Sequence, residues 1–254
     1  MEAIRRVLCE LLPEAKAETL EALAAGSSRC PFARGQEILA PGTPLRVLIL
    51  LDGAAGVYHD APDGRRAILH IARAPDFVGV LSPYQTVQSV GAVALTPCDA
   101  VLFPGSLLSD SAARDDGVAR NLLRWSNGRL DLMLRRLALL TFLPTRERLA
   151  LALITYDVLT AGDGEHPPIL GRSDLASLIG ASREMTAHAF RALEREGLVR
   201  RIGRRRLEVL DREGLEQAAG DWAIDALGPT IEPPSPIRTG DDAVQCERDT
   251  HGHD

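Results

Sequence analysis

Nine arginines lie between residues 172 and 206, in a chain of 254 residues that is acidic elsewhere. The same segment holds four acidic residues, so its net charge is +5, whereas the whole chain carries −6. Basic side chains bind nucleic acid mainly by neutralising phosphates and releasing counterions. A strongly basic segment in an acidic chain therefore predicts contact with nucleic acid, and favours it over a merely solvated basic helix face.

The basic segment also has the pattern of two short helices around a tight turn. Ser173 and Ser182 can cap the two helices, and Gly180 can take the positive φ that the turn needs. The second helix is expected to bury Met185, Ala189, Phe190 and Leu193, which recur at steps of three to four residues. Two short strands flank Gly203, at residues 198–202 and 207–210. This order predicts a winged helix-turn-helix.

The remaining chain divides by its hydrophobic period. Residues 1–25 read as helical on both sides of Pro13. Residues 30–108 instead hold short apolar runs separated by Gly, Pro and Asp clusters, which is typical of a β-sandwich or barrel, and Asp63-Gly64 is the clearest hairpin turn among them. Residues 112–143 and 145–160 read as helices, and the Pro- and Asp-rich end reads as a disordered tail. We expect a sensor domain at 1–110, a long helix at 111–143, a DNA-binding domain at 144–220 and a tail at 221–254.

The long helix carries apolar rows at heptad spacing. Leu123, Leu130 and Leu137 form one row, and Ser126, Met133 and Leu140 lie beside it. A third row at positions 125, 132 and 139 widens the apolar surface, so that one side could meet a partner helix and the other the β domain. The pattern therefore favours a partner helix packed against the first two rows. The alternative is a core helix in a monomer.

Composition excludes several classes of protein. No apolar run approaches the ~20 residues of a membrane span, and the first residues lack a signal-peptide core, so the expectation is a cytoplasmic protein without a membrane partner. The four cysteines, at positions 9, 30, 98 and 246, lack CxxC spacing, so neither a disulfide scaffold nor a metal site is expected. No catalytic residue is assigned. A cupin-like enzyme would need metal ligands clustered around His59 and His70, which the pattern does not supply.

Several motifs resemble the cyclic-AMP receptor/FNR (Crp/Fnr) family of bacterial transcription regulators over residues 10–212. They are Arg34-Gly35-Gln36-Glu37-Ile38-Leu39 with Gly42, residues 48–53 with Val57-Tyr58, Asp63-Gly64-Arg65, residues 75–79, and Ile179-Gly180-Ala181-Ser182-Arg183-Glu184. The resemblance implies an α+β fold. It consists of an N-terminal cyclic-nucleotide-binding-like β-roll (jelly roll), a long central dimerisation helix and a C-terminal winged helix-turn-helix.

The resemblance also implies a homodimer that binds a palindromic site in double-stranded DNA and contacts RNA polymerase. Arg183 and Glu184 are expected to read bases, since arginine can donate two bonds to guanine and glutamate can accept one from cytosine. Where the family usually has a second base-reading arginine, this chain has His188, which predicts a different half-site. The expected DNA contacts are Ser173, Ser182, Arg183, Glu184, Thr186, Ala187, His188, Arg191, Arg200, Arg201, Arg204, Arg205 and Arg206.

The expected signal is harder to assign. Cyclic-nucleotide binders of the family have a glutamate where this chain has Val80 and an arginine near Gln88, so cyclic AMP is not expected in the usual mode. The scattered cysteines do not suit an iron–sulfur cluster, which needs four thiolates. Haem on His59, His70 or Cys98 remains an alternative, as do a redox role for an exposed Cys98 and a constitutive regulator. The effector is therefore unknown, and the expected pocket residues are Phe77, Gly79, Val80, Gln88, Ser89, Leu130 and Met133.

Overall fold

The computed structural model describes residues 2–79, 87–161, 172–202 and 206–220. Two helices at the N-terminus, α1 (Glu2–Leu11) and α2 (Ala17–Ala25), are separated at Pro13 as the sequence predicts. Their apolar faces bury Leu8 and Leu23 against the β domain that follows, together with Leu12 in the link between the helices. Within the described ranges, no helix combines the length and the apolar character needed to cross a bilayer.

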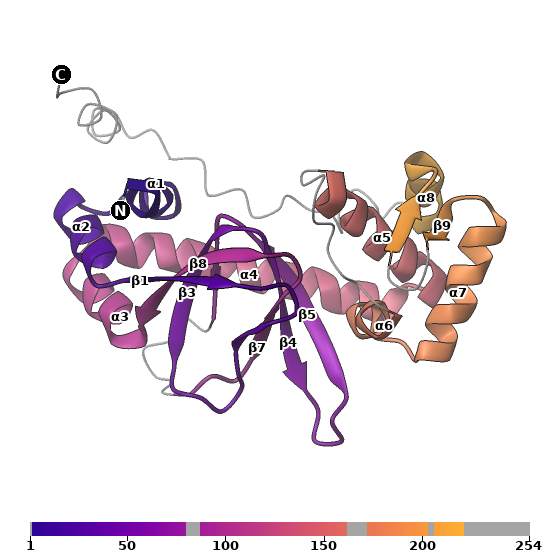
Figure 1. Ribbon diagram of the computed structural model, residues 1–254, viewed down its shortest axis with the longest axis horizontal. Helices are drawn as coiled ribbons and strands as arrows, with labels where there is room; N and C mark the ends of the chain where they lie inside the picture. Colours follow the sequence, from indigo (N-terminus) through magenta and orange to yellow (C-terminus); the bar gives the residue numbers. More distant parts are fainter. Residues whose placement is uncertain (1, 80–86, 162–171, 203–205, 221–254) are drawn as a thin grey trace.

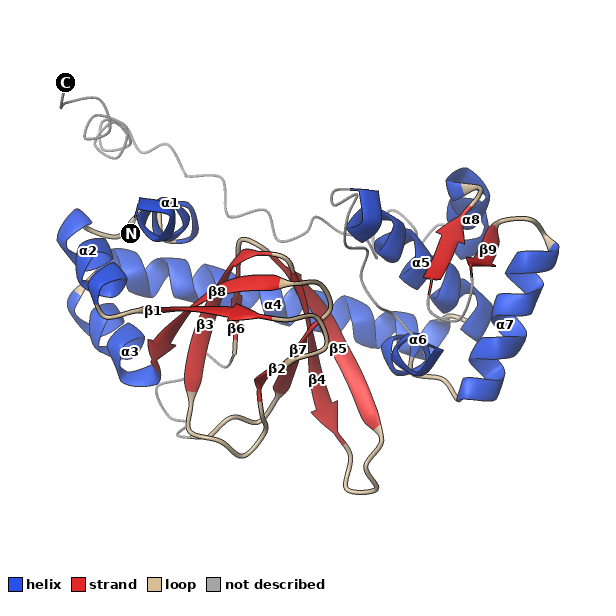
Figure 2. Cartoon of the chain, viewed as in Figure 1, coloured by secondary structure: helices blue, strands red, loops and turns tan. Residues whose placement is uncertain are grey.

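Residues 28–104 form two antiparallel sheets of four strands each, shown in red in Figure 2. The strand orders are β1-β8-β3-β6 and β2-β7-β4-β5, so β5 lies at an edge. The predicted turn at Asp63-Gly64 joins β4 to β5, and Gly64 has a φ of 81° there. The strands are β1 (Ser28–Phe32), β2 (Glu37–Leu39), β3 (Arg46–Asp52), β4 (Ala54–Asp60), β5 (Arg66–Arg73), β6 (Asp76–Val78), β7 (Gly91–Ala94) and β8 (Cys98–Pro104).

Strand β3 is apolar on both faces, and each face serves a different core. Leu48 and Leu50 point between the two sheets, where they meet small residues such as Ala55 and Ala92. The alternate residues, Val47 and Ile49, join the core beneath the helices. The period of two residues in a strand thus explains why one run of sequence fills two cores.

The long helix begins later than the sequence predicts. Instead of one helix from residue 112, the chain forms α3 (Gly105–Arg114) and then α4 (Asp116–Phe142). Asp115 separates them with an extended backbone, and its carboxylate accepts the amide hydrogen of Gly117 at 2.9 Å. The predicted helix runs across this N-cap, although residues 114–117 are all polar or glycine, and the predicted limit at residues 110/111 lies inside α3.

The C-terminal part is a winged helix-turn-helix, as predicted, and its core includes Leu149, Leu153, Phe190, Leu193 and Leu215. Its elements are α5 (Thr145–Ala161), α6 (Arg172–Ile179), α7 (Arg183–Arg195), the paired strands β9 (Val199–Ile202) and β10 (Arg206–Val209), and α8 (Arg212–Ala219). In Figure 1, α4 runs along the β-roll from the end that holds α1–α3 to the end that holds the helix-turn-helix. One helix therefore connects the two domains.

Candidate nucleic-acid interface

The turn between α6 and α7 is built by the residues that the sequence singled out. Gly180 has a φ of 61°, and the amide of Ala181 donates to the carbonyl of Ala176 at 3.0 Å. Ser182 caps α7, since its hydroxyl accepts the amide hydrogen of Met185 at 3.1 Å. The first turn of α7 is therefore fixed with its N-terminus, the positive end of its dipole, toward solvent.

Two residues of α7 differ from expectation. Thr186, a predicted DNA contact, is only 2% exposed and donates its hydroxyl hydrogen to the Ser182 carbonyl at 2.8 Å, so its side chain is part of the packing within the domain. Met185, expected in the core, is 53% exposed. The buried face is centred on Thr186, Phe190 and Leu193, and Met185 lies one residue, about 100°, around the helix from it. Compared with the prediction, Thr186 is buried in place of Met185, and the apolar Met185 side chain lies on the outer surface of α7.

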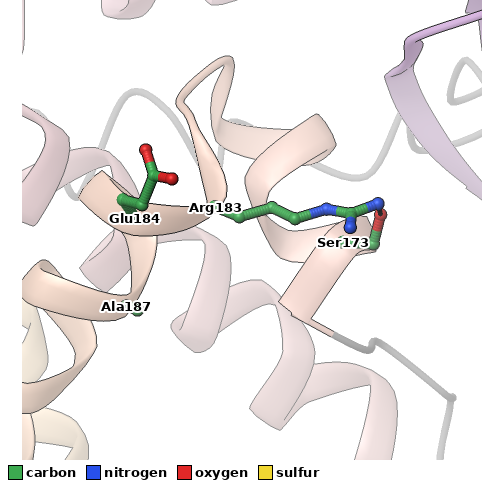
Figure 3. A pocket seen from close by; sticks show the side chains of 4 residues that line it. All are labelled: Ser173, Arg183, Glu184 and Ala187. Atoms are coloured by element: carbon green, nitrogen blue, oxygen red, sulfur yellow. Dashed lines mark hydrogen bonds between the residues drawn. The ribbon is translucent and has the colours of Figure 1, made fainter.

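An open cleft of about 480 Å³ lies between the N-terminal ends of α6 and α7. It is lined by Ser173, Arg183, Glu184 and Ala187, which Figure 3 shows from close by. The Arg183 guanidinium reaches across and donates to the Ser173 hydroxyl at 3.1 Å, while Glu184 points away from it. Four of the predicted DNA contacts are thus brought together, and Arg183 and Glu184 are both exposed.

The predicted arginines further along are placed in different ways. Arg191 is exposed on α7, as is His188. On the wing, Arg200 pairs with Glu208 of the opposite strand, and the Arg201 guanidinium lies 4.9 Å from the Phe190 ring centre. Arg204 and Arg205 fall outside the described residues, as does the side chain of Arg206. The wing therefore carries positive charge beside α7, part of it already paired.

The two sides of α4 are clearly separated. On the side facing the β-roll, Trp125 Nε1 and Arg129 Nη2 donate to the Asp76 carboxylate at 2.8 and 2.6 Å. On the opposite side, Leu123, Leu130 and Leu137 are 62, 58 and 61% exposed. Leu134, which the heptad rows did not include, is 57% exposed, whereas Leu140 is 36% exposed and Ser126 and Met133 are half-buried. An apolar row therefore faces solvent along α4.

The predicted effector residues that the structure describes lie in different surroundings. Phe77 is buried edge-to-face against Trp125, whereas Leu130 lies on the outer side of α4 and Ser89 is exposed. The reason is the rotation of α4 about its own axis. Positions 125, 129 and 136 face the β-roll, whereas the prediction placed positions 130 and 133 there. Val80 lies outside the described residues.

Gln88 lies near the position at which the family's cyclic-nucleotide binders carry a phosphate-binding arginine. It is 2% exposed, and its amide nitrogen donates to the Arg46 carbonyl. Gly79 lies beside it with a φ of 124°, and a Cβ there would come within 2.7 Å of the same carbonyl oxygen. The amide of Gln88 is thus held by the backbone of the roll.

The residues considered for haem or redox chemistry lie in contrasting surroundings. His59 is exposed. Burial, Arg129 and Arg136 lower the pKa of His70 well below its usual value, which keeps the imidazole neutral. The Cys98 thiol is buried and donates to the Ala54 carbonyl at 3.3 Å, and burial raises its pKa, which favours an inert thiol. In the described part of the chain, no group of three or more His, Cys, Asp or Glu is arranged to hold a metal ion.

Comparison with known proteins identifies both domains. A family model described as a Crp-like helix-turn-helix domain matches residues 147–218, and one described as a cyclic nucleotide-binding domain matches residues 29–115. The CRP-like cAMP-activated global transcriptional regulator of Mycobacterium tuberculosis is 29% identical over 194 residues, which cover 74% of this chain and 86% of the relative. The chain belongs to the Crp/Fnr family.

Further relatives and solved structures agree with this assignment. The cAMP-activated global transcriptional regulator Vfr of Pseudomonas aeruginosa is 24% identical over 72% of this chain and 90% of its own length. The structure of FixK2 from Bradyrhizobium japonicum superposes with a TM-score of 0.64 at 25% identity, covering 76% of this chain and 96% of FixK2. This Crp/Fnr chain is a DNA-binding transcription regulator and not an enzyme.

Some residues that shape the Crp/Fnr fold here were missed by sequence reasoning. The helical pattern assigns Met185 to the core, and it gives no contact role to Asp76, Arg129 or Arg136. The sequence carries a weak signal for such contacts. It consists of an aspartate in the motif after β5 and of arginines at 129 and 136, which have the spacing of the roll-facing row of α4. The helical period alone could not separate these polar residues from solvated ones.

Proposed function

We propose that this regulator works as a homodimer joined through α4. The supporting observation is the outward row of Leu123, Leu130, Leu134 and Leu137, each 57–62% exposed. Monomers rarely expose extended apolar patches. A second copy of the same helix covers such a row with two-fold symmetry, in which each leucine row packs against its own equivalent.

The dimer would present two α7 helices to a palindromic double-stranded DNA site, with half-sites about one helical turn apart. We assign base reading to Arg183, Glu184 and His188, with Ala187 lining the cleft beside them. The hydrogen bond from Arg183 to Ser173 would be exchanged for a bond to a base. Exposed Met185 suits apolar contact with a thymine methyl group.

The remaining contacts are assigned to the phosphate backbone. The helix N-termini at Ser173 and Ser182 suit phosphate oxygens. The basic side chains assigned to the flanking backbone are Arg191, Arg200, Arg201, Arg204, Arg205 and Arg206. Contact with RNA polymerase and a cytoplasmic location follow from family membership and stay predictions.

Substitution of Arg183 tests the DNA assignment. Arg183→Ala should cost about 1–3 kcal/mol per half-site and relax base choice at one position, measured by fluorescence anisotropy on sites selected from randomised DNA. Arg205→Ala should weaken all sequences about equally and flatten the salt dependence. Arg29→Ala is the matched control, since Arg29 lies on the β-roll and pairs with Asp99. The assignment of α7 is wrong if Arg183→Ala and Arg205→Ala both bind like Arg29→Ala.

A second candidate is a regulator that needs no ligand. Its support is Gln88, whose amide is hydrogen bonded to the Arg46 backbone in place of a cationic phosphate anchor, and the apolar packing between the sheets. In that case purified protein would bind its selected site without additives, and cyclic AMP would leave the affinity unchanged. Native mass spectrometry with absorbance would separate this candidate from a regulator that retains a nucleotide or haem.

A further inference from the structure

Arg136 of α4 contacts three parts of the chain at once. Its Nη2 donates to the carbonyl oxygen of Ile68 on β5 at 2.7 Å. The same nitrogen donates to the carbonyl oxygen of Leu178 in α6. One terminal nitrogen therefore joins the β-roll, the long helix and the helix-turn-helix.

Both acceptors belong to elements that leave some of their backbone carbonyls without a partner. The last carbonyls of a helix have no amide within the helix to pair with, and Leu178 is the penultimate residue of α6. Strand β5 lies at the edge of its sheet, so carbonyls on its outer side have no neighbouring strand. A cation near the C-terminal end of α6 also complements the helix dipole. The position of α6 beside β5 thus creates a site that an arginine fits.

The charge of Arg136 makes this contact sensitive to the positions of its two acceptors. Burial lowers its pKa to about 10, so the side chain stays protonated at neutral pH but has lost much of its hydration. Arg136 and Arg129 both lower the pKa of His70, which is therefore neutral, and the carboxylate of Asp76 is bound to Arg129. A partly desolvated cation is stabilised only where acceptors are held at the right positions. Movement of α6 away from β5 would remove that arrangement.

Apolar contacts surround the same junction. Ile68 of the roll is 3% exposed and belongs to one continuous core with Leu178 and Ile179 of α6. At the end of α4, a Cβ built on Gly180 would lie 2.9 Å from Leu140 Cδ2, so Leu140 packs against the turn before α7. The orientation of α7 relative to α4 is therefore set by contacts on both sides of α6.

We propose that Arg136 is a positioning residue for DNA binding. By holding α6 against β5, it sets the angle of α7 relative to α4 and so the spacing of the two recognition helices in the dimer. This rests on the proposed homodimer. A dimer reads spacing because one inserted base pair moves a half-site by about 3.4 Å and turns it by about 34°. Arg136 thereby links the β-roll to the choice of DNA site.

The test compares spacing preference rather than affinity alone. The probes are a palindromic duplex selected from randomised DNA by the full-length wild-type protein and the same duplex with one central base pair inserted or deleted. Arg136→Met keeps the length of the side chain but removes its charge and donors. We expect it to reduce the preference for the selected spacing by about tenfold, since bonds from a charged donor are lost. Arg136→Lys, which keeps the cation, should recover part of that preference.

Arg120→Met is the control, because Arg120 is exposed on the same helix and pairs with Glu14. The proposal is overturned if Arg136→Met keeps the wild-type preference, or weakens all three duplexes equally. If thermal melting shows that Arg136→Met does not fold, Arg136→Gln is used with the same expected loss. A wild-type protein without any spacing preference would instead contradict the homodimer on a palindrome, which separates failure of the proposed function from failure of this inference.

Discussion

Truncation of Leu130 on the outward face of α4 should weaken the dimer by a calculable amount. Full burial of a leucine side chain is worth about 1.5–3 kcal/mol. Leu130 is 58% exposed in the single chain, so covering it in a dimer contributes about 0.9–1.7 kcal/mol per copy. Because the two-fold interface contains the residue twice, Leu130→Ala should cost about 2–3 kcal/mol, or about 30–150-fold in the dimer Kd.

Sedimentation equilibrium over a range of protein concentrations measures that Kd directly. Leu210→Ala is the matched control, since Leu210 is 49% exposed and follows the wing rather than lying on α4. Affinity for a palindromic duplex should fall together with dimerisation in Leu130→Ala, while thermal stability of the monomer changes little. An unchanged Kd in Leu130→Ala, or an equal loss in Leu210→Ala, would refute the assignment of this face as the dimer interface.

Two further predictions concern the start of α4. Gly117→Ala should destabilise the fold by about 2 kcal/mol or more in urea unfolding, because a Cβ there would lie 1.8 Å from the Glu14 carbonyl oxygen and the backbone must shift. A wild-type midpoint would contradict it. Asp115→Ala should cost about 1–3 kcal/mol, because the amide hydrogens of Lys16 and Gly117 each lose an acceptor at 2.9 Å. Burial raises the pKa of Asp115, but the hydrogen bonds from Lys16, Thr19 and Gly117 together lower it by more. The pKa of Asp115 in the folded state is therefore below its ordinary value. Its contribution is therefore present above about pH 3.9 and lost as the pH falls, and the gap between wild type and Asp115→Ala should close in acid. A gap that stays constant down to acid unfolding would contradict this.

The sequence predicted the elements whose signals are local. The cap at Ser182, the positive φ of Gly180 and the turn at Asp63-Gly64 all appear in the structure, because each depends on a few neighbouring residues. The alternation in β3 likewise reflects a strand buried on both faces. Periodic patterns predicted where strands and helices lie because burial on one face repeats with the geometry of the element itself.

The errors arose where an element's neighbours decide the outcome. The predicted helix runs across Arg114-Asp115-Asp116-Gly117, which carry no apolar side chain. The contacts of the Asp115 carboxylate with Lys16 and Gly117 show that one helix ends and another begins there. At α7, the spacing of Met185 fits the buried face as well as that of Thr186 does. The rotation of the helix on its neighbours decides which of the two residues is buried. Thr186 fills the buried position because its hydroxyl donates to the Ser182 carbonyl of the same helix.

Arg136 shows why coupling between the domains leaves only a weak signature in the sequence. Its two acceptors are backbone carbonyls of Ile68 and Leu178, and a carbonyl is present whatever side chain those residues carry. Apolar substitutions at 68 or 178 should therefore leave the polar link in place as long as the packing is kept, whereas any loss of the arginine removes both hydrogen bonds together. The junction therefore depends on one side chain and on the packing that holds the two carbonyls in place. The control of recognition-helix spacing would rest on a residue that the apolar heptad rows do not include.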